Sequence, residues 1–305
     1  MNNKLIIILG PTATGKTNLA TKLAFNFNAE IISSDSRQVY KYLDIGTGKD
    51  LDEYNINNNS IPYHLIDIIN PDTDYSVYEF QKEFHTIYDD IIARNKVPIL
   101  CGGTALYIDS ILFDYNIAPS APNSLLREEL NNYNYNDLKN KLLEINSSEY
   151  NPEYHISKRR LIRSIEILSH NKQIINMNLQ GDEKFTNSLV IGMHIDRQEL
   201  LKKIKNRLIG RIKIGMIDEV EKLLNNGVSA QRLYSLGLEY RFISDYLIGK
   251  VNYDVMIDKL NIAINQFSKR QMTFFRRMEK RGIKIHWLAE NKKNIFMSNI
   301  KQYLK

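Results

Sequence analysis

The sequence predicts an α/β fold, in which a P-loop-type parallel sheet has flanking helices and carries an inserted helical subdomain. Three observations predict it. Short apolar runs alternate with helical patterns over residues 1–115, as in a parallel sheet with crossover helices. A glycine-rich segment joins the first apolar run to the first helical pattern. From Tyr115 to about Gln180 the chain is rich in asparagine and helical in period.

The first part of the core should alternate strands and helices in the order of a doubly wound sheet. Four short apolar runs are expected to be strands: Lys4–Leu9, Glu30–Ser33, Tyr63–Ile68 and Val97–Cys101. Three segments with apolar residues at helical spacing are expected to be helices: Lys16–Phe27, Val77–Arg94 and Thr104–Leu112. Residues 55–59 are expected to be a loop tip.

The rest of the chain divides into two further segments. Residues 116–187 are expected to be an inserted helical subdomain, which Pro119 and Pro122 introduce. Residues 188–305 should return to the core, with a strand at Ser188–Ile195, several helices and a late strand at Ile283–Leu288. The catalytic core is therefore expected to have two parts, 1–115 and 188–305.

Composition excludes several classes of protein. The chain has 305 residues, 43% hydrophobic and 25% charged, which are ordinary globular values and exclude a disordered chain or a collagen-like fibre. No apolar run reaches the roughly 18 residues that span a bilayer, so we expect no membrane contact and a cytoplasmic location. The single cysteine, Cys101, excludes an intramolecular disulfide, and no Cys/His spacing indicates zinc.

Positive charge is concentrated more than the net charge of +6 suggests. Two segments, 197–213 and 269–284, are rich in lysine and arginine and each contains a single acidic residue. Solvated helix faces would explain one such segment, but two favour a polyanionic partner. Four aromatic residues at or near these segments are expected to pack in the core rather than stack on bases: Phe267, Phe274, Phe275 and Trp287.

The glycine-rich segment fits the pattern G-x-x-x-x-G-K-[ST] at every fixed position. Its residues are Gly10, Pro11, Thr12, Ala13, Thr14, Gly15, Lys16 and Thr17. The glycines let successive backbone N–H groups point into one concavity at a helix N-terminus, and Lys16 adds a mobile cation. Such a loop binds a di- or triphosphate, with the Thr17 hydroxyl placed to hold Mg²⁺. The pattern does not say what the phosphates are attached to, and a chance match is the alternative.

A carboxylate, Asp35, follows the second expected strand, at the carboxyl edge where open α/β sheets bind ligands. There it faces the glycine-rich loop, so it could hold magnesium through water or accept a proton from a nucleophile. Arg37 and Gln38 beside it could hydrogen-bond a base or a phosphate. A simple capping role for Asp35 is the equal alternative.

Six motifs then occur in a fixed order: GPTATGKT, DSRQVY from Asp35, DIGTGK from Asp44, HLIDI from His64, YSVYEF from Tyr75 and GGTALY from Gly102. In this order they resemble the tRNA dimethylallyltransferases, also called tRNA isopentenyltransferases. The resemblance continues through Ser157–Glu166, Arg207 with Gly215–Val220, and Ser268–Arg276, so it spans nearly the whole chain. Because six or more motifs occur in the same order as in the family, the resemblance is specific.

The resemblance implies a reaction and its catalytic residues. The dimethylallyl group would pass from dimethylallyl diphosphate to N6 of the adenosine on the 3′ side of the anticodon in tRNA, giving N6-isopentenyladenosine and diphosphate. The loop Gly10–Thr17 would hold the diphosphate, with Mg²⁺ on Thr17. Asp35 would be the base, and Thr12, Lys16 and Arg207 would act at the reacting centre and the leaving group.

The resemblance also implies tRNA contacts, since a stacked adenosine must be turned out to reach a carboxylate in a cleft. The implied contacts are Asp35, Ser36, Arg37, Gln38, Thr104, Arg127, Arg159, Arg160, Leu161, Ile162 and Arg163. The chain departs from the family pattern at Arg211, where many members have methionine, and at Leu236–Tyr240, which replaces the commoner Ile-Gly-Tyr. The departures affect expected RNA contacts rather than the reaction.

Three alternatives share some of these features. A prenyltransferase acting on free adenine nucleotides would need the loop and Asp35 but no RNA-gripping insertion. A small-molecule P-loop kinase, binding ATP, would share the loop alone. A non-catalytic RNA-binding module would not need the Lys16–Thr17 pair. The resemblance implies the anticodon stem-loop of tRNA and dimethylallyl diphosphate as partners, and we expect a monomer.

Overall fold

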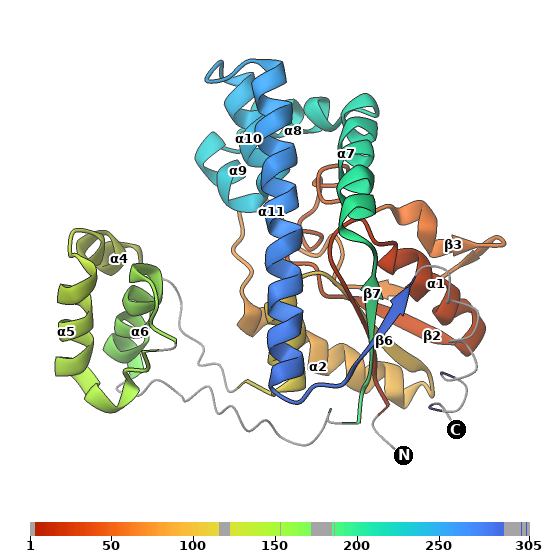
Figure 1. Cartoon of the computed structure of the whole chain (residues 1–305), viewed down its shortest axis with the longest axis horizontal. Helices are drawn as coiled ribbons and strands as arrows, with labels where there is room; N and C mark the ends of the chain where they lie inside the picture. Colours follow the sequence, from red (N-terminus) through yellow and green to blue (C-terminus); the bar gives the residue numbers. More distant parts are fainter. Residues whose placement is uncertain are drawn as a thin grey trace. The chain divides into compact units, whose positions relative to one another are not determined.

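A computed structural model describes residues 4–115, 123–152, 154–171, 185, 187–289, 300 and 303 (Figure 1). The chain divides into two compact units. The first, here called the core unit, comprises Met1–Leu112 and Glu183–Lys305, and the second, the helical unit, comprises Phe113–Asp182. The expected boundaries lie a few residues from these limits, and Pro119 and Pro122 fall outside the described residues.

The core unit is built on one six-stranded sheet in the order β5-β2-β6-β1-β7-β8, and all its neighbouring pairs are parallel. Its strands are β1 Ile6–Leu9, β2 Ala29–Ser33, β5 Tyr63–His64, β6 Val97–Gly102, β7 Leu189–His194 and β8 Ile285–Ala289. The predicted fold class is therefore confirmed.

The central strand β1 explains why its sequence is continuously apolar. It lies between β6 and β7, with Ile6 opposite Ile99 on one side and Leu189 on the other. All four β1 residues are fully buried, as expected for a parallel strand covered on both faces. Ile6, Ile31 and Ile99 pack with Leu23 of the first helix in one hydrophobic cluster.

The expected strand Tyr63–Ile68 is shorter in the structure. Only Tyr63 and His64 pair with β2, because Leu65 and Asp67 adopt left-handed backbone conformations with φ of 62° and 57°. The expected loop tip contains a small hairpin, β3 Asn55–Ile56 and β4 Asn59–Ser60, after a 3-10 turn, η1 Leu51–Tyr54. Asn57 and Asn58 both have positive φ, which matches the asparagine preference of tight hairpin turns.

Eight α-helices of the core unit lie among the described residues. They are α1 Lys16–Phe27, α2 Val77–Ala93, α3 Ala105–Leu112, α7 Arg197–Lys213, α8 Met216–Asn225, α9 Ala230–Leu236, α10 Leu238–Leu247 and α11 Tyr253–Lys280. Helix α2 starts with a capping box made by Ser76 and Glu79. In the described part of the chain, none of the helices is long and apolar enough to cross a membrane.

A second hydrophobic cluster joins the C-terminal helices to the segment that follows β2. Val39 and Leu43 of that segment pack with Leu208 of α7, Tyr240 of α10 and Leu260 of α11. Figure 1 shows α8, α9 and α10 gathered near one end of α7 and α11. The C-terminal helices thereby hold the segment between β2 and β5, where DSRQVY and DIGTGK lie.

The helical unit has its own core. Its elements are α4 Ser124–Asn131, α5 Tyr135–Asn146, the 3-10 turn η2 Ser147–Glu149 and α6 Lys158–Asn171. Leu130, Leu142 and Ile165 are among its buried core residues. Asn123 and Asn134 cap α4 and α5 by accepting backbone N–H bonds, which accounts for part of the asparagine content.

Candidate functional site

The segment Gly10–Thr17 forms a tight loop between β1 and α1. Gly10, Ala13 and Gly15 all have positive φ, and a Cβ at Gly10 would lie 2.9 Å from Cβ of Met193. Lys16 Nζ donates to the Pro11 carbonyl at 2.9 Å, and the Thr14 hydroxyl donates to the same carbonyl at 2.8 Å. The loop therefore curls around the lysine at the N-terminus of α1, a geometry that can bind an anion.

The charge on Lys16 is finely balanced. Burial, together with the neighbouring Arg207, lowers the pKa of Lys16 to about 8, although Cys101 and Asp35 act in the opposite direction. Burial likewise lowers the pKa of Arg207 to about 10, so this guanidinium stays charged at neutral pH. An anion bound at the loop would stabilise both cations.

Two residues from the C-terminal helices fix Thr12 of the loop. Arg207 of α7 donates to the Thr12 hydroxyl. Gln271 of α11 accepts from the Thr12 backbone N–H at 3.0 Å, and its amide also donates to the Gly103 carbonyl at 2.8 Å. Gln271, whose importance the sequence did not reveal, thus joins the loop after β1 to the turn after β6.

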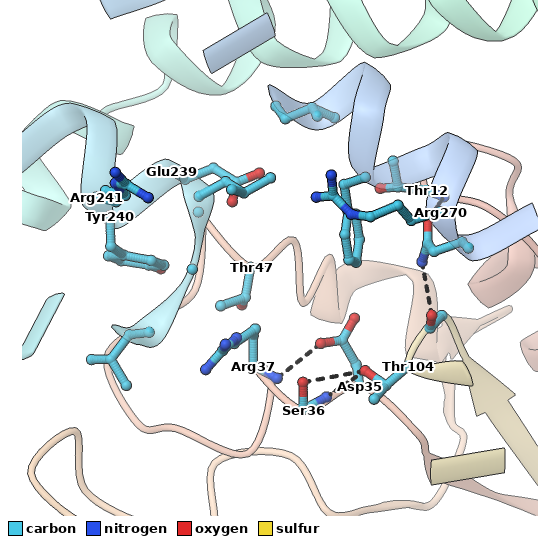
Figure 2. Close-up of a pocket in the computed structure, with 18 of the residues that line it drawn as sticks. Thr12, Asp35, Ser36, Arg37, Thr47, Thr104, Glu239, Tyr240, Arg241 and Arg270 are labelled. Atoms are coloured by element: carbon cyan, nitrogen blue, oxygen red, sulfur yellow. Dashed lines mark hydrogen bonds between the residues drawn. The ribbon is translucent and has the colours of Figure 1, made fainter. Parts of the chain in front are cut away.

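Asp35 stands at the end of β2. One of its carboxylate oxygens accepts the Arg37 backbone N–H at 2.9 Å, which caps the turn over residues 36–39 rather than the N-terminus of a helix. No residue in the described ranges donates to the second oxygen. Beside it, the Thr104 hydroxyl accepts the Ser36 N–H at 3.0 Å and donates to the Ser36 hydroxyl at 3.3 Å (Figure 2). Asp35 therefore combines a capping role with a free acceptor.

These residues share one cavity of about 460 Å³, within the usual range for ligand pockets. Six predicted site residues line it: Thr12, Asp35, Ser36, Arg37, Thr104 and Arg207. Gln38 does not line it, because its amide accepts from the Ser33 hydroxyl at 3.0 Å and donates to the Gly48 carbonyl at 2.9 Å. The sequence therefore identified much of one wall of this cavity.

Another part of the lining comes from α10 and α11. It includes Glu239, Arg241, Phe267, Arg270 and Phe274. The expectation that Phe267 and Phe274 pack in the core is wrong, because both face the cavity and Phe267 is 38% exposed, whereas Phe275 is fully buried. Helical spacing cannot distinguish a core aromatic from one that lines a cavity on the same helix.

The cavity is strongly cationic. Five arginines line it, Arg37, Arg207, Arg211, Arg241 and Arg270, against the two carboxylates of Asp35 and Glu239. Such an excess of arginine suits a ligand with several phosphates. The position of Arg270 explains part of the basic segment 269–284.

Glu219 of α8 holds the loop that contains Gly46 and Thr47, two residues that line the cavity. Its carboxylate accepts three backbone N–H bonds, from Asp44 at 2.9 Å, Ile45 at 2.7 Å and Gly46 at 3.0 Å. The Tyr240 hydroxyl donates to it as well, at 2.7 Å. The motif DIGTGK is thus held by a residue far away in the sequence.

Lysine 49, at the end of this loop, is 1% exposed. Its ammonium donates to the Tyr40 carbonyl at 2.8 Å and to Asp44 at 2.6 Å, and it also pairs with Asp67. The buried ammonium therefore has three partners, and these contacts hold the end of the loop against Tyr40 and Asp67.

The remaining predicted RNA contacts lie in the helical unit. Arg159 is exposed on α6, Arg160 donates to the Tyr154 carbonyl at 2.8 Å, and Arg163 pairs with buried Glu166 at 2.5 Å. Arg127 of α4 also pairs with Glu166, at 2.8 Å. The Asn123 backbone N–H donates to the same carboxylate at 2.5 Å.

Leu161 and Ile162 were expected to be among the RNA contacts, but both side chains pack in the core of the helical unit. They lie on the apolar face of α6, so neither side chain is available to a ligand at the surface. Arg159 is the exposed residue of the predicted segment, and Arg160 and Arg163 are partly buried.

The residues present fit the expected magnesium ion. Within the described residues, no group of three or more His, Cys, Asp or Glu side chains could hold a metal. No partner for the Thr17 hydroxyl is found there either, so this oxygen is free to bind a ligand. Magnesium commonly combines one or two protein ligands with water and phosphate oxygens, which is what Thr17 beside an anion-binding loop offers.

Comparison with known families supports the resemblance found from the motifs. The model of the IPP transferase family matches residues 38–278, and that of isopentenyl transferases matches residues 3–59. The chain is 46% identical over 286 residues to tRNA dimethylallyltransferase 1 of Parabacteroides distasonis, covering 93% of this chain and 92% of that protein. It is 47% identical over 285 residues to tRNA dimethylallyltransferase 1 of Azobacteroides pseudotrichonymphae, with the same coverage.

Solved structures show the same fold. The crystal structure of the tRNA isopentenylpyrophosphate transferase from Bacillus halodurans superposes with a TM-score of 0.71 at 31% identity, over 99% of this chain and 97% of that one. A eukaryotic dimethylallyltransferase acting on tRNA superposes with a TM-score of 0.77 over 98% of this chain and 77% of that one. At 22% identity, this second likeness concerns the fold alone.

Proposed function

The chain belongs to the IPP transferase family, and we propose that it transfers a dimethylallyl group from dimethylallyl diphosphate to N6 of the adenosine on the 3′ side of the anticodon in tRNA. The products are N6-isopentenyladenosine and diphosphate. One observation carries the proposal: Asp35, which has a free carboxylate oxygen, lines the same cavity as Thr12 and Arg207 at the anion-binding loop.

On the donor side, the reaction breaks the bond between the allylic carbon and a diphosphate oxygen, so negative charge grows on the leaving diphosphate. The backbone N–H groups of the loop, Lys16 and Arg207 are the groups proposed to stabilise that charge where it develops, which is supported by Thr12 of the loop and Arg207 lining one cavity. A magnesium ion held by Thr17 would supply further neutralisation of the phosphates.

On the acceptor side, the new bond joins N6 to the allylic carbon, and N6 loses one proton. The lone pair of this amine is delocalised into the ring, so it is a poor nucleophile until the proton is removed. Asp35 is the proposed base, because its free oxygen faces the cavity while its other oxygen keeps the turn in place.

The acceptor adenosine has to leave its stack to reach this depth, at a cost that an unpaired loop base keeps to a few kcal/mol. Ser36, Arg37 and Thr104 line the cavity next to Asp35 and are the proposed contacts to the displaced nucleotide. The exposed Arg159 and the partly buried Arg160 of α6 are the proposed contacts to the anticodon stem. Because tRNA is the acceptor, the proposed site of action is the cytoplasm.

Two alternatives can be separated by one experiment. The full-length chain, with Mg²⁺ and radiolabelled dimethylallyl diphosphate, is offered unmodified tRNA or AMP as acceptor. Label in tRNA, at the adenosine beside the anticodon, supports the proposal. Label in AMP with none in tRNA would establish the free-nucleotide enzyme instead. Label in neither acceptor, together with phosphate transfer from ATP to a small metabolite in a parallel assay, would establish a kinase. Light scattering of the same sample tests the expected monomer.

A further inference from the structure

Glu239 is a carboxylate of the cavity for which the proposed reaction has no role. It lies in the first turn of α10, whose N-cap is Gly237, and is partly buried. In Figure 2 it lies across the cavity from Asp35 and Ser36. Glu239 belongs to the segment Leu236–Tyr240, one of the places at which this sequence departs from its family pattern; Arg211 is another, and both residues line the cavity.

Within the described part of the chain, the donor to the carboxylate of Glu239 is its own backbone N–H. No other described residue hydrogen-bonds to it or forms an ion pair with it, although the charges of Arg211 and Arg207 act on it. Both guanidiniums are engaged elsewhere, Arg211 with Asp50 at 3.3 Å and Arg207 with the Thr12 hydroxyl. Burial raises the pKa of Glu239 despite these two arginines. A carboxylate that is shielded from water and has only its own backbone N–H as a donor keeps unfilled acceptor sites, which is costly, so a further partner should come from a ligand.

Of the two substrates in the proposed function, only one can supply that partner. A dimethylallyl diphosphate offers acceptor oxygens, negative charge and hydrocarbon, so it has nothing to donate to a carboxylate. RNA offers donors in the amino groups of its bases and in its 2′-hydroxyl groups. Phosphates of the RNA would be repelled by Glu239 and attracted by the five arginines instead. The chemistry of Glu239 therefore fits a nucleoside.

Resting on the proposed function, we propose that Glu239 is a specificity-determining residue, which accepts a hydrogen bond from an amino or 2′-hydroxyl group of the RNA across the cavity from Asp35. Asp35 and Glu239 then serve different purposes. Asp35 takes a proton from the reacting amine, while Glu239 keeps a hydrogen bond to a group that does not react. A site built to accept such a bond rejects a ligand that lacks the donor.

The test is equilibrium binding, because binding needs no turnover. Fluorescently labelled anticodon stem-loop RNA and dimethylallyl diphosphate are titrated, separately, into the full chain and into Glu239→Ala, Glu239→Gln and Glu221→Gln. Glu221 is exposed on α8, outside the cavity, so its substitution removes the same charge without the contact. We expect Glu239→Ala to weaken RNA binding about tenfold or more, and to change affinity for the diphosphate less than about twofold.

The two control variants sharpen the result. Glu239→Gln keeps an acceptor oxygen and should lose less RNA affinity than Glu239→Ala, and Glu221→Gln should bind both ligands like wild type. Unchanged RNA affinity in Glu239→Ala would overturn the proposal. So would a change confined to dimethylallyl diphosphate, which would make Glu239 a counter-charge for Arg207 and Arg211. Melting curves of each variant show whether it is folded.

Modified RNAs identify the donor. Stem-loops that lack one 2′-hydroxyl or one amino group, position by position, are compared on wild type and Glu239→Ala. The donor is the group whose removal weakens binding to wild type several-fold and has no effect on the variant. If every deletion weakens both proteins equally, Glu239 contacts none of these groups and the inference is wrong. Absence of dimethylallyl transfer, with Glu239-dependent RNA binding intact, would instead overturn the proposed function alone.

Discussion

The side chain of Gln271 accepts the backbone N–H of Thr12 at 3.0 Å, across 259 residues of sequence. The same amide donates to the Gly103 carbonyl at 2.8 Å, and a Cβ at Gly103 would lie 2.4 Å from its nitrogen. One buried residue of α11 therefore determines the separation between the anion-binding loop and the turn after β6. The direction in which the Thr12 hydroxyl meets Arg207 depends on it.

Replacing Gln271 with alanine should lower kcat/KM for dimethylallyl diphosphate about tenfold, which corresponds to about 1.4 kcal/mol of lost stabilisation. The reason is that the Thr12 N–H loses its acceptor and the loop is no longer held in one arrangement. Steady-state kinetics at saturating tRNA measure this. Gln266→Ala, at an exposed position on the same helix, is the control. A fall in tRNA affinity alone would contradict the assignment of Gln271 to the donor side.

The sequence predicted the parts of this site that are local in the chain. The loop Gly10–Thr17 and the position of Asp35 follow from strand, turn and helix patterns. Gln271 and Glu219 could not be found in this way, because each acts through backbone groups distant in sequence. Leu161 was misassigned because a family motif includes residues of both faces of a helix, and only burial distinguishes them.

Asp35→Asn tests whether the carboxylate acts as a base or only as a cap. Asparagine can still accept the Arg37 N–H, so the turn should survive, but it cannot take a proton. We expect kcat to fall about 100-fold to 10,000-fold while the dissociation constant for tRNA changes little. Rapid-quench measurement of a single turnover and a separate binding titration give the two values. Near-normal turnover in Asp35→Asn would leave Asp35 with its capping role alone.

Because of Lys16, the affinity for dimethylallyl diphosphate should decrease at alkaline pH. Its folded-state pKa is about 8, so raising the pH through this value removes the positive charge that a diphosphate needs. Affinity for dimethylallyl diphosphate should therefore fall as the pH rises above about 8, by up to about tenfold per unit. Titration calorimetry from pH 7 to pH 9.5 measures it, and Lys16→Met should show a lower, flatter profile. Equal slopes in both proteins would mean that another group is responsible.

The lowered pKa of Lys16 affects the stability of the fold in the opposite direction to ligand affinity, because stability should rise with pH. Between about pH 8 and the ordinary value of 10.5, the unfolded chain binds more protons at this lysine than the folded chain does. The contribution of Lys16 to the free energy of unfolding should therefore rise with pH over that interval. Urea denaturation of wild type and Lys16→Met at several pH values isolates it as a difference. A difference that falls with pH would show that the lysine is better stabilised in the folded protein than in water.

Glu219→Ala should destabilise the core unit by about 2–4 kcal/mol. The substitution leaves the N–H groups of Asp44, Ile45 and Gly46 without their acceptor, along with the Tyr240 hydroxyl. Tyr240→Phe removes only one of these four bonds and should cost about 1 kcal/mol. Urea denaturation compares both with Glu221→Ala, an exposed change on the same helix. If Glu219→Ala were as stable as Glu221→Ala, the loop would be held mainly by Lys49.

Two arginines of α6 should respond differently to substitution, because one is exposed and the other neutralises a buried acid. Arg159→Ala should weaken binding of the anticodon stem-loop RNA several-fold and reduce the slope of log K against log salt by about 1, since one phosphate contact is lost. Its melting curve should match wild type.

Arg163→Ala removes a partner of Glu166, which is 1% exposed, and should destabilise the helical unit by about 2 kcal/mol or more. Binding titrations at four salt concentrations, with melting curves for both variants, separate the two effects. An unchanged salt slope in Arg159→Ala would mean that this face of α6 keeps the helix soluble and does not contact the RNA backbone.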